Sequence, residues 1–227
     1  RTHPRLLASA ADFRALRESL GTSSSPRDQL AQAVIHHADL LADVPPITRT
    51  LEGRRLLGQS RCCLERMVNL SMAWQLTGEA KYVQRGKQEM LAVAAFSDWN
   101  PSHFLDVAEM TLAMAIGYDW MFDGLDEAED EPEWAAKTVH SALQNVPRSM
   151  QAYAPHGSYP EGPSYWVYGT SFNVVLLATL DKLLGTDFGL SKISGFDQTG
   201  GYLSLVTGPS GEAFNYADGS ARRGPSE

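Results

Sequence analysis

Residues 54–96 decide the fold class, and they read RRLLGQSRCCLERMVNLSMAWQLTGEAKYVQRGKQEMLAVAAF. Within 54–77, apolar and small residues recur at the spacing of one helix face: Leu57, Leu64, Met67, Val68, Ser71 and Trp74. Gly78 predicts the end of this helix, because glycine is favoured just past a helix terminus. A second helix is predicted over 79–96. The link between the two is so short that they form an antiparallel pair.

The rest of the chain continues the helical pattern. Ser9 and Asp12 form a capping box that opens a helix, and Ser25-Pro26 predicts the start of another over 27–41. Further helices are predicted over 104–122, 130–153, 163–184 and, with a weaker pattern, 197–206. No strand alternation of useful length precedes residue 200. The sequence therefore predicts an all-α chain of antiparallel helical hairpins, which can stack as a solenoid or curl into an α/α toroid.

Composition bounds the class of protein. The 227 residues include 19 Lys and Arg against 27 Asp and Glu, which gives a net charge of −8 and argues against nonspecific binding of nucleic acid. No apolar run reaches the roughly 18 residues that a membrane span needs. The loops at 44–53, 97–103 and 154–162 show no domain boundary, so residues 1–227 are predicted to form a single domain. Cys62 and Cys63 are predicted to lie in or near the core, and no Cys/His spacing indicates a metal site.

Three segments carry residues suited to chemistry. Residues 156–168 read HGSYPEGPSYWVY, in which Glu161 precedes a predicted helix start. This carboxylate can simply stabilise the helix, because a negative charge near a helix N-terminus interacts favourably with the helix dipole. The dense aromatic residues around it can be core or a platform for sugar rings. Residues 208–219 read GPSGEAFNYADG, which is either an ordinary turn or a polar binding loop. In the third segment, Asp106, Glu109 and Asp119 can do acid–base work or bind donors within the helices.

Four stretches together resemble one family. They are His3-Pro4-Arg5-Leu6-Leu7, residues 104–110 with 115–120, residues 159–166, and residues 208–218, in that order along nearly the whole chain. The sequence is similar in these stretches to the heparinase II/III-like polysaccharide lyases. The resemblance implies the N-terminal part of an (α/α) toroid, as an incomplete barrel. The family's C-terminal β-sandwich domain would then be absent from this chain, as in a fragment of a longer protein.

The resemblance also implies an activity, the cleavage of a uronate-containing polysaccharide by β-elimination. Such an enzyme neutralises the uronate carboxylate, removes the C5 proton and protonates the O4 leaving group. The family motifs place Tyr216 as the catalytic base or acid and Glu161 as the group that meets the carboxylate, while His156 is a weaker catalytic candidate. Glu161 would have to be protonated, or share a proton, when it meets the substrate, because two anions in contact repel. The candidate substrate contacts are Asn215, Trp166, Tyr165, Tyr159 and Arg222.

The resemblance bears on partners and location as well. An acidic polysaccharide or oligosaccharide is the expected partner, and a periplasmic or secreted location is implied by that polymer. No cofactor is evident, and any metal would involve later sequence that this chain lacks. The net charge of −8 favours a weakly sulfated substrate such as hyaluronan, chondroitin or alginate.

Two other functions stay open on the sequence. An α/α-toroid glycoside hydrolase would pair Glu161 with Asp106 or Asp218. A noncatalytic carbohydrate-binding protein of stacked helical hairpins would tolerate loss of both Glu161 and Tyr216. The fold alone does not choose among the three functions.

Overall fold

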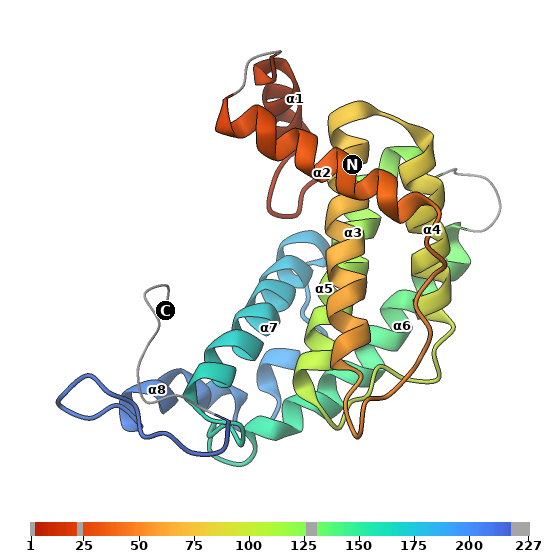
Figure 1. The fold of residues 1–227 in the computed structure, drawn as a ribbon. Helices are drawn as coiled ribbons and strands as arrows, with labels where there is room; N and C mark the ends of the chain where they lie inside the picture. Colours follow the sequence, from red (N-terminus) through yellow and green to blue (C-terminus); the bar gives the residue numbers. More distant parts are fainter. Residues whose placement is uncertain (1–2, 22–24, 126–130, 219–227) are drawn as a thin grey trace. The chain divides into compact units, whose positions relative to one another are not determined.

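The computed structural model describes residues 3–21, 25–125 and 131–218, except the side chains of 131–139 and 183–184. The described residues form eight α-helices and four short 3-10 helices, with two isolated β-bridges and no strand (Figure 1). The all-α class predicted from the sequence is therefore confirmed. Closure of the hairpins into a toroid stays a prediction.

By its internal contacts the chain divides into two compact units. Unit 1 comprises Arg1–Trp99 and Glu109–Ala142, and unit 2 comprises Asn100–Ala108 and Leu143–Glu227. Helices α5 (Phe104–Met121) and α6 (Glu131–Met150) each contribute residues to both units.

Unit 1 is built on helices whose ends follow the predicted signals. They are α1 (Ala10–Ser19), α2 (Pro26–Ala42), α3 (Leu57–Thr77) and α4 (Ala80–Ala94), with α3 in contact with the other three. The predicted capping box is present, with Ser9 Oγ accepting from Asp12 N–H, and Ser25 caps α2 with Pro26 at its first position. Gly78 ends α3 in the left-handed conformation, with φ of 73°. The α3–α4 pair thus forms the predicted hairpin.

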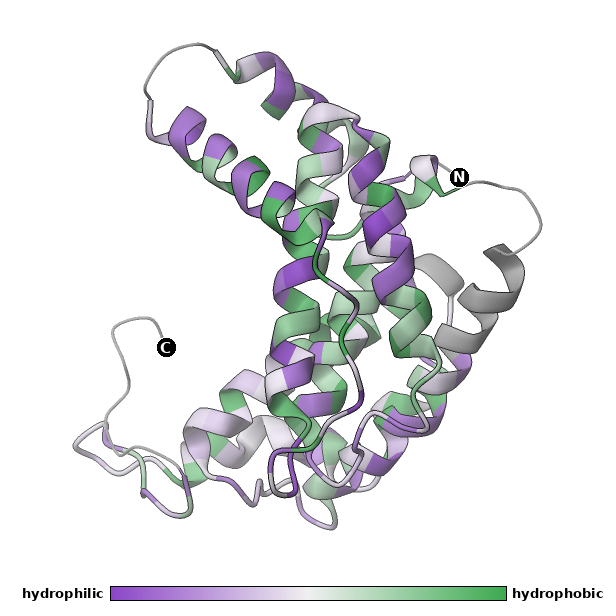
Figure 2. Cartoon of the chain, turned by 45° about the vertical axis from the view of Figure 1, so that its right-hand side comes forward, coloured by the Kyte–Doolittle hydropathy of each residue, from purple (hydrophilic) through white to green (hydrophobic). Residues whose placement is uncertain are grey.

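Close helix packing in unit 1 depends on two glycines facing methionines. A Cβ at Gly117 of α5 would lie 2.2 Å from Met67 Cε of α3, and one at Gly86 of α4 would lie 2.5 Å from Met121 Sδ of α5. Contacts this short do not exist between real atoms, so a larger residue at either position would require the methionine side chain to move. In Figure 2 most of these helices carry both hydrophobic and hydrophilic residues along their length, as amphipathic helices do.

The two cysteines belong to this core. Cys63 is fully buried and Cys62 is half-buried, which confirms the predicted placement in or near the core. Burial raises the pKa of the Cys63 thiol well above its ordinary value. Both side chains therefore stay protonated and act as small packing groups.

Unit 2 contains α7 (Pro163–Leu184), the end of α6, α8 (Tyr202–Leu205) and the 3-10 helices η2 (Gln151–Tyr153), η3 (Leu190–Lys192) and η4 (Phe196–Gly201). The weakly predicted helix over 197–206 is therefore a 3-10 turn followed by one short α-helix. Aromatic rings form the core of the unit. Tyr153 lies 5.6 Å from Phe104, 5.6 Å from Tyr159 and 5.2 Å from Phe196, measured between ring centroids.

The buried face of α7 differs from the predicted one. The apolar pattern of 163–184 predicts that Phe172, Val175, Leu176, Leu180 and Leu183 face the core. Val175 is 38 % exposed, Phe172, Leu176 and Leu180 are half-buried, and the side chain of Leu183 lies outside the described residues. The buried positions among the described side chains of α7 are Pro163, Gly169, Thr170, Asn173 and Leu177. The prediction was wrong for Val175 because the helix carries apolar residues all round, so hydropathy does not mark which face is inside.

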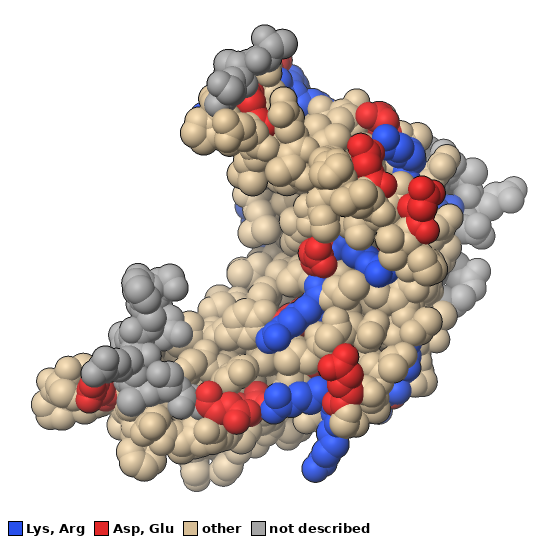
Figure 3. Space-filling model, viewed as in Figure 1, with Lys and Arg blue, Asp and Glu red and all other residues tan. Residues whose placement is uncertain are grey.

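No helix in the described part of the chain is both long enough and apolar enough to span a membrane. On the face drawn in Figure 3, acidic and basic side chains are interspersed.

Candidate functional site

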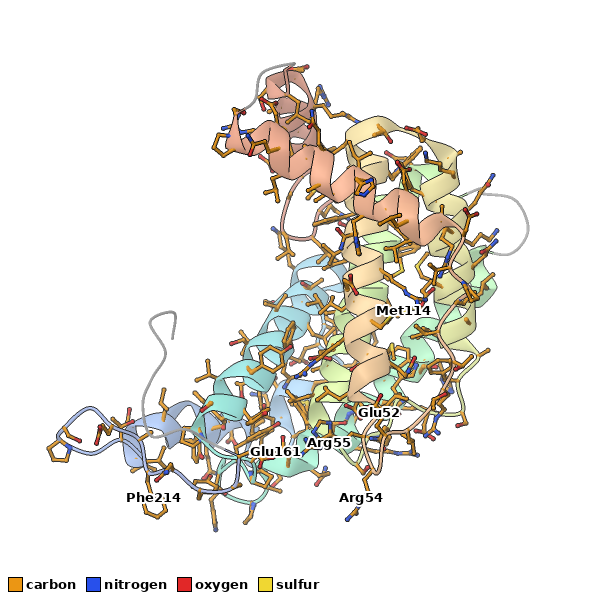
Figure 4. The ribbon with its side chains drawn as sticks, viewed as in Figure 1. Glu52, Arg54, Arg55, Met114, Glu161 and Phe214 are labelled. Atoms are coloured by element: carbon orange, nitrogen blue, oxygen red, sulfur yellow. The ribbon has the colours of Figure 1, made fainter. Side chains whose placement is uncertain are left out.

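Glu161 lies on a loop whose tight turn into α7 depends on a glycine. The loop follows η2, and Gly162 adopts φ of 91° as the N-cap of α7. Pro163 then occupies the first helical position, where its missing N–H costs nothing. Glu161 therefore lies at the start of α7, with its side chain 22 % exposed (Figure 4).

His103 joins Glu161 to a buried carboxylate. Its Nδ1 lies 2.7 Å from Asp106 Oδ1, and its Nε2 lies 3.2 Å from Glu161 Oε1. The other oxygen of Asp106 accepts from Asn100 Nδ2 at 2.6 Å, and Asn100 Oδ1 accepts from Ser102 Oγ at 2.9 Å. These groups all belong to unit 2. The result is a carboxylate–imidazole–carboxylate chain that runs from the buried Asp106 to the partly exposed Glu161.

The charge state of His103 follows from this chain. Burial alone would lower the pKa of the imidazole, but hydrogen bonds to Asp106 and Glu161 and the two negative charges raise it to about 9. At neutral pH the ring is therefore an imidazolium. It donates Nδ1–H to Asp106 and turns its Nε2–H toward Glu161.

Tyr216 approaches the same loop from the tail of the chain. The preceding residues form a tight hairpin, in which Phe214 N–H donates to Val206 O at 2.7 Å and Gly208 N–H donates to Glu212 O at 2.9 Å. From the end of this hairpin the Tyr216 hydroxyl donates to the backbone carbonyl of Tyr159 at 2.5 Å. Tyr159 precedes Glu161 by two residues, so the phenol meets the loop that carries the carboxyl group.

A second phenol, Tyr202, hydrogen-bonds to Tyr216. Because a carbonyl only accepts, the Tyr216 proton is directed to Tyr159 O, and Tyr202 is left as the donor to the Tyr216 oxygen. Burial and the bond to Tyr216 raise the pKa of Tyr202 above its ordinary value, so Tyr202 holds its proton. The hydrogen bonds therefore run from Tyr202 to Tyr216 and from Tyr216 to the Tyr159 carbonyl.

Aromatic side chains lie around these groups. Trp166 is half-buried and tilts against Tyr202 with 5.5 Å between ring centroids, and its indole N–H donates to Thr199 Oγ1 at 2.7 Å. Phe214 is 71 % exposed and lies 6.2 Å from the Tyr216 ring (Figure 4). An exposed ring beside polar groups is the kind of surface that the apolar face of a sugar can cover.

The predicted site residues have different outcomes. Tyr165 is half-buried at the start of α7, and Asn215 is exposed beside Tyr216. His156 is exposed on the loop after η2. Arg222 lies outside the described residues. The roles proposed for these four residues stay predictions.

Tyr159 requires a correction. The sequence suggested that its ring contacts the substrate, but the side chain is 1 % exposed and packs against Phe104 and Tyr153. Burial raises the pKa of its phenol above the ordinary value. Tyr159 serves the site through its backbone carbonyl, which accepts from Tyr216.

The carboxylates of the third segment have separate tasks. Asp119 in unit 1 accepts from the backbone N–H groups of Arg5 and Leu6, both at 2.7 Å, and lies 2.7 Å from His3 Nδ1. Glu109, also in unit 1, accepts from Ser60 Oγ at 2.7 Å. The structural interpretation therefore fits these two, while Asp106 belongs to the His103 chain.

Sequence reasoning missed His103 and Tyr202 as site residues. His103 and Asp106 stand three residues apart at the start of α5, the spacing of one helix turn, and this signal was present in the sequence. Tyr202 carried no local signal, since only the folded chain brings it to Tyr216.

Comparison with models of known protein families gives no match, and no curated protein matches the chain either. Among the described residues, no group of three or more His, Cys, Asp and Glu side chains is arranged to hold a metal ion.

Proposed function

We propose that this chain is part of a polysaccharide lyase that cleaves a uronate-containing polymer by β-elimination. The observation that carries the proposal is the hydrogen bond from Tyr216 to the Tyr159 carbonyl. It brings a phenol from the tail to the loop of Glu161, although 55 residues separate the two in the sequence. A phenol and a carboxyl group near one loop are what β-elimination beside a carboxylate needs.

Tyr216 is suited to proton transfer at the sugar. Its proton is held by a carbonyl and its oxygen accepts from Tyr202. When a sugar oxygen replaces the carbonyl, the same proton is available for the O4 leaving group. The donor bond from Tyr202 favours the phenolate that remains, because a hydrogen bond to the charged form stabilises it. In elimination Tyr216 acts first as the phenolate, which takes the C5 proton. The phenol so formed then gives that proton to O4 as the C4–O4 bond breaks and the C4–C5 double bond forms.

Glu161 is suited to bind the uronate carboxylate because it is the partly exposed end of the carboxylate–imidazole–carboxylate chain. Two unit charges 3 Å apart repel by about 5 kcal/mol at an effective dielectric constant of about 20. A carboxylate at Glu161 would therefore exclude the substrate unless it gained a proton. His103 at 3.2 Å from Glu161 Oε1 is a protonated neighbour that meets this need.

Four sequence stretches that occur together also pair up within the units. The N-terminal stretch meets the 115–120 stretch where Arg5 and Leu6 donate to Asp119. The 208–218 stretch meets the 159–166 stretch where Tyr216 donates to Tyr159. Pairs of motifs that bind each other have a physical reason to occur in one chain, and this supports the resemblance that motivates the proposal.

The test is an assay for the unsaturated uronate that elimination leaves. The protein is incubated with hyaluronan, chondroitin, alginate and heparin while the ultraviolet absorbance is followed. We expect a rise with at least one unsulfated or weakly sulfated polymer. Tyr216→Phe should lower the rate by about 100-fold or more, as loss of a general acid or base does.

Tyr168→Phe is the matched control. Tyr168 lies on α7, is 36 % exposed and packs edge-on against Phe172. This variant should keep the rate of the unaltered protein. Polymer cleavage that releases reducing ends without the absorbance, and that survives Tyr216→Phe, would refute elimination.

A further inference from the structure

The three groups of the carboxylate–imidazole–carboxylate chain differ in access to solvent. The side chain of Asp106 is 0 % exposed, that of His103 is 10 % exposed and that of Glu161 is 22 % exposed. A ligand that arrives from solvent therefore meets Glu161 first, and His103 acts behind it.

We propose that His103 stores the proton with which Glu161 receives an anionic sugar. The inference rests on the proposed function. When a uronate carboxylate reaches Glu161, the Nε2–H bond of His103 breaks and its proton forms an O–H bond with Glu161 Oε1. The electron pair of that bond stays on Nε2. Glu161 is then a neutral carboxylic acid that donates to the uronate, and no proton is taken from solution.

The geometry around His103 makes this transfer specific. The Nδ1–H bond to Asp106 at 2.7 Å remains after the transfer, so the neutral imidazole has one defined tautomer. Asp106 is held in turn by Asn100 through its second oxygen. Of the two imidazole N–H groups, the one at Nε2 faces Glu161, with Nε2 3.2 Å from Oε1.

Electrostatics gives the transfer its direction. Without a ligand, an imidazolium beside two carboxylates is the favourable state, consistent with a pKa of about 9 for His103. The uronate carboxylate of the ligand is a third negative charge, and it lies next to Glu161. It repels the charge on Glu161 more strongly than the charge on the deeper Asp106, because the interaction falls with distance. The anion of the ligand therefore moves the proton outward. In this scheme His103 is a positioning residue, since it acts through Glu161.

The experiment observes the imidazole directly. The protein, labelled with nitrogen-15 in its histidines, is studied by NMR at pH 7.5 with increasing sodium D-glucuronate, and with D-glucose as the uncharged control. We expect His103 to be doubly protonated alone and with glucose, and to lose the Nε2 proton with glucuronate. In Glu161→Gln the proton should stay on His103, because the acceptor is gone.

A second measurement follows the affinity for glucuronate between pH 6 and 8. In the unaltered protein the affinity should be constant, because the proton moves within the site. In His103→Gln, Glu161 must take its proton from solution, so the affinity should fall about tenfold per pH unit across this range.

The outcomes separate the two proposals. Glucuronate that binds while His103 keeps both protons would overturn the proton store and leave the lyase proposal standing. Equal loss of the proton with glucose would do the same. Absence of any glucuronate binding would overturn both proposals.

Discussion

The stability of the protein should depend on pH through His103. In the folded chain the pKa of this imidazole is about 9, against an ordinary value of 6.5 in an unfolded chain. The folded state therefore binds more protons between these values, and the stabilisation is fully present below pH 6.5 and is lost as the pH rises through 9. A rise in pKa from 6.5 to about 9 corresponds to about 3 kcal/mol at about 1.36 kcal/mol per pH unit.

The expected effect is smaller than this upper bound. Glu161 is partly exposed, and solvent screening weakens its share of the interaction with His103. We therefore expect about 2 kcal/mol. Replacement of His103 by glutamine removes the titrating group but keeps a side chain that can hydrogen-bond.

Urea unfolding followed by circular dichroism measures this difference at pH 6, 7, 8, 9 and 10. At pH 6 the unaltered protein should exceed His103→Gln in unfolding free energy by about 2 kcal/mol, and at pH 10 the two should be nearly equal. His156→Gln is the matched control, because this histidine is exposed on a loop of the same unit. It should keep the pH dependence of the unaltered protein. Parallel curves for the unaltered protein and His103→Gln across the whole range would refute the charge assignment.

Three further substitutions probe unit 2. Gly195→Ala would place a Cβ 2.1 Å from the Tyr153 carbonyl oxygen at a φ of 84°, so the melting temperature should fall by about 6–12 °C for a loss of about 3 kcal/mol. Gly185→Ala has a similar φ of 72° in open space and should cost only about 1 kcal/mol; equal losses for the two variants would contradict the close contact. Tyr202→Phe removes the donor to Tyr216, so kcat should fall about tenfold with an unchanged circular dichroism spectrum, while an unchanged kcat would argue against a role for that bond.

Helix ends were predictable because their causes are local. Ser25 and Pro26 start α2, and Gly78 and Gly185 end α3 and α7 in left-handed conformations. Each signal depends on backbone groups within about four residues, so the sequence alone suffices.

The candidate site was predictable only in part, because its key contacts are not local. The ion pair between His103 and Glu161 joins positions 58 residues apart, and no spacing rule gives it. Tyr159 illustrates the opposite error. Aromatic density around Glu161 fitted either core or a sugar platform, because it does not tell a ring that faces solvent from one that is buried. Tyr159 was assigned to the substrate, and its ring is in the core.

The state of Asp106 bears on the choice between elimination and hydrolysis. A glycoside hydrolase that paired Glu161 with Asp106 would need both carboxyl groups at the sugar, one on each side of the scissile bond. Asp106 is fully buried, with one oxygen bound to His103 and the other to Asn100. Releasing it would leave an imidazolium without one of its two anionic partners, which is costly at a buried position. Asp106 is therefore better suited to fix the charge of His103 than to touch a substrate. A hydrolase would then have to pair Glu161 with Asp218, whereas the lyase that we propose assigns the proton transfer at the sugar to the phenol of Tyr216.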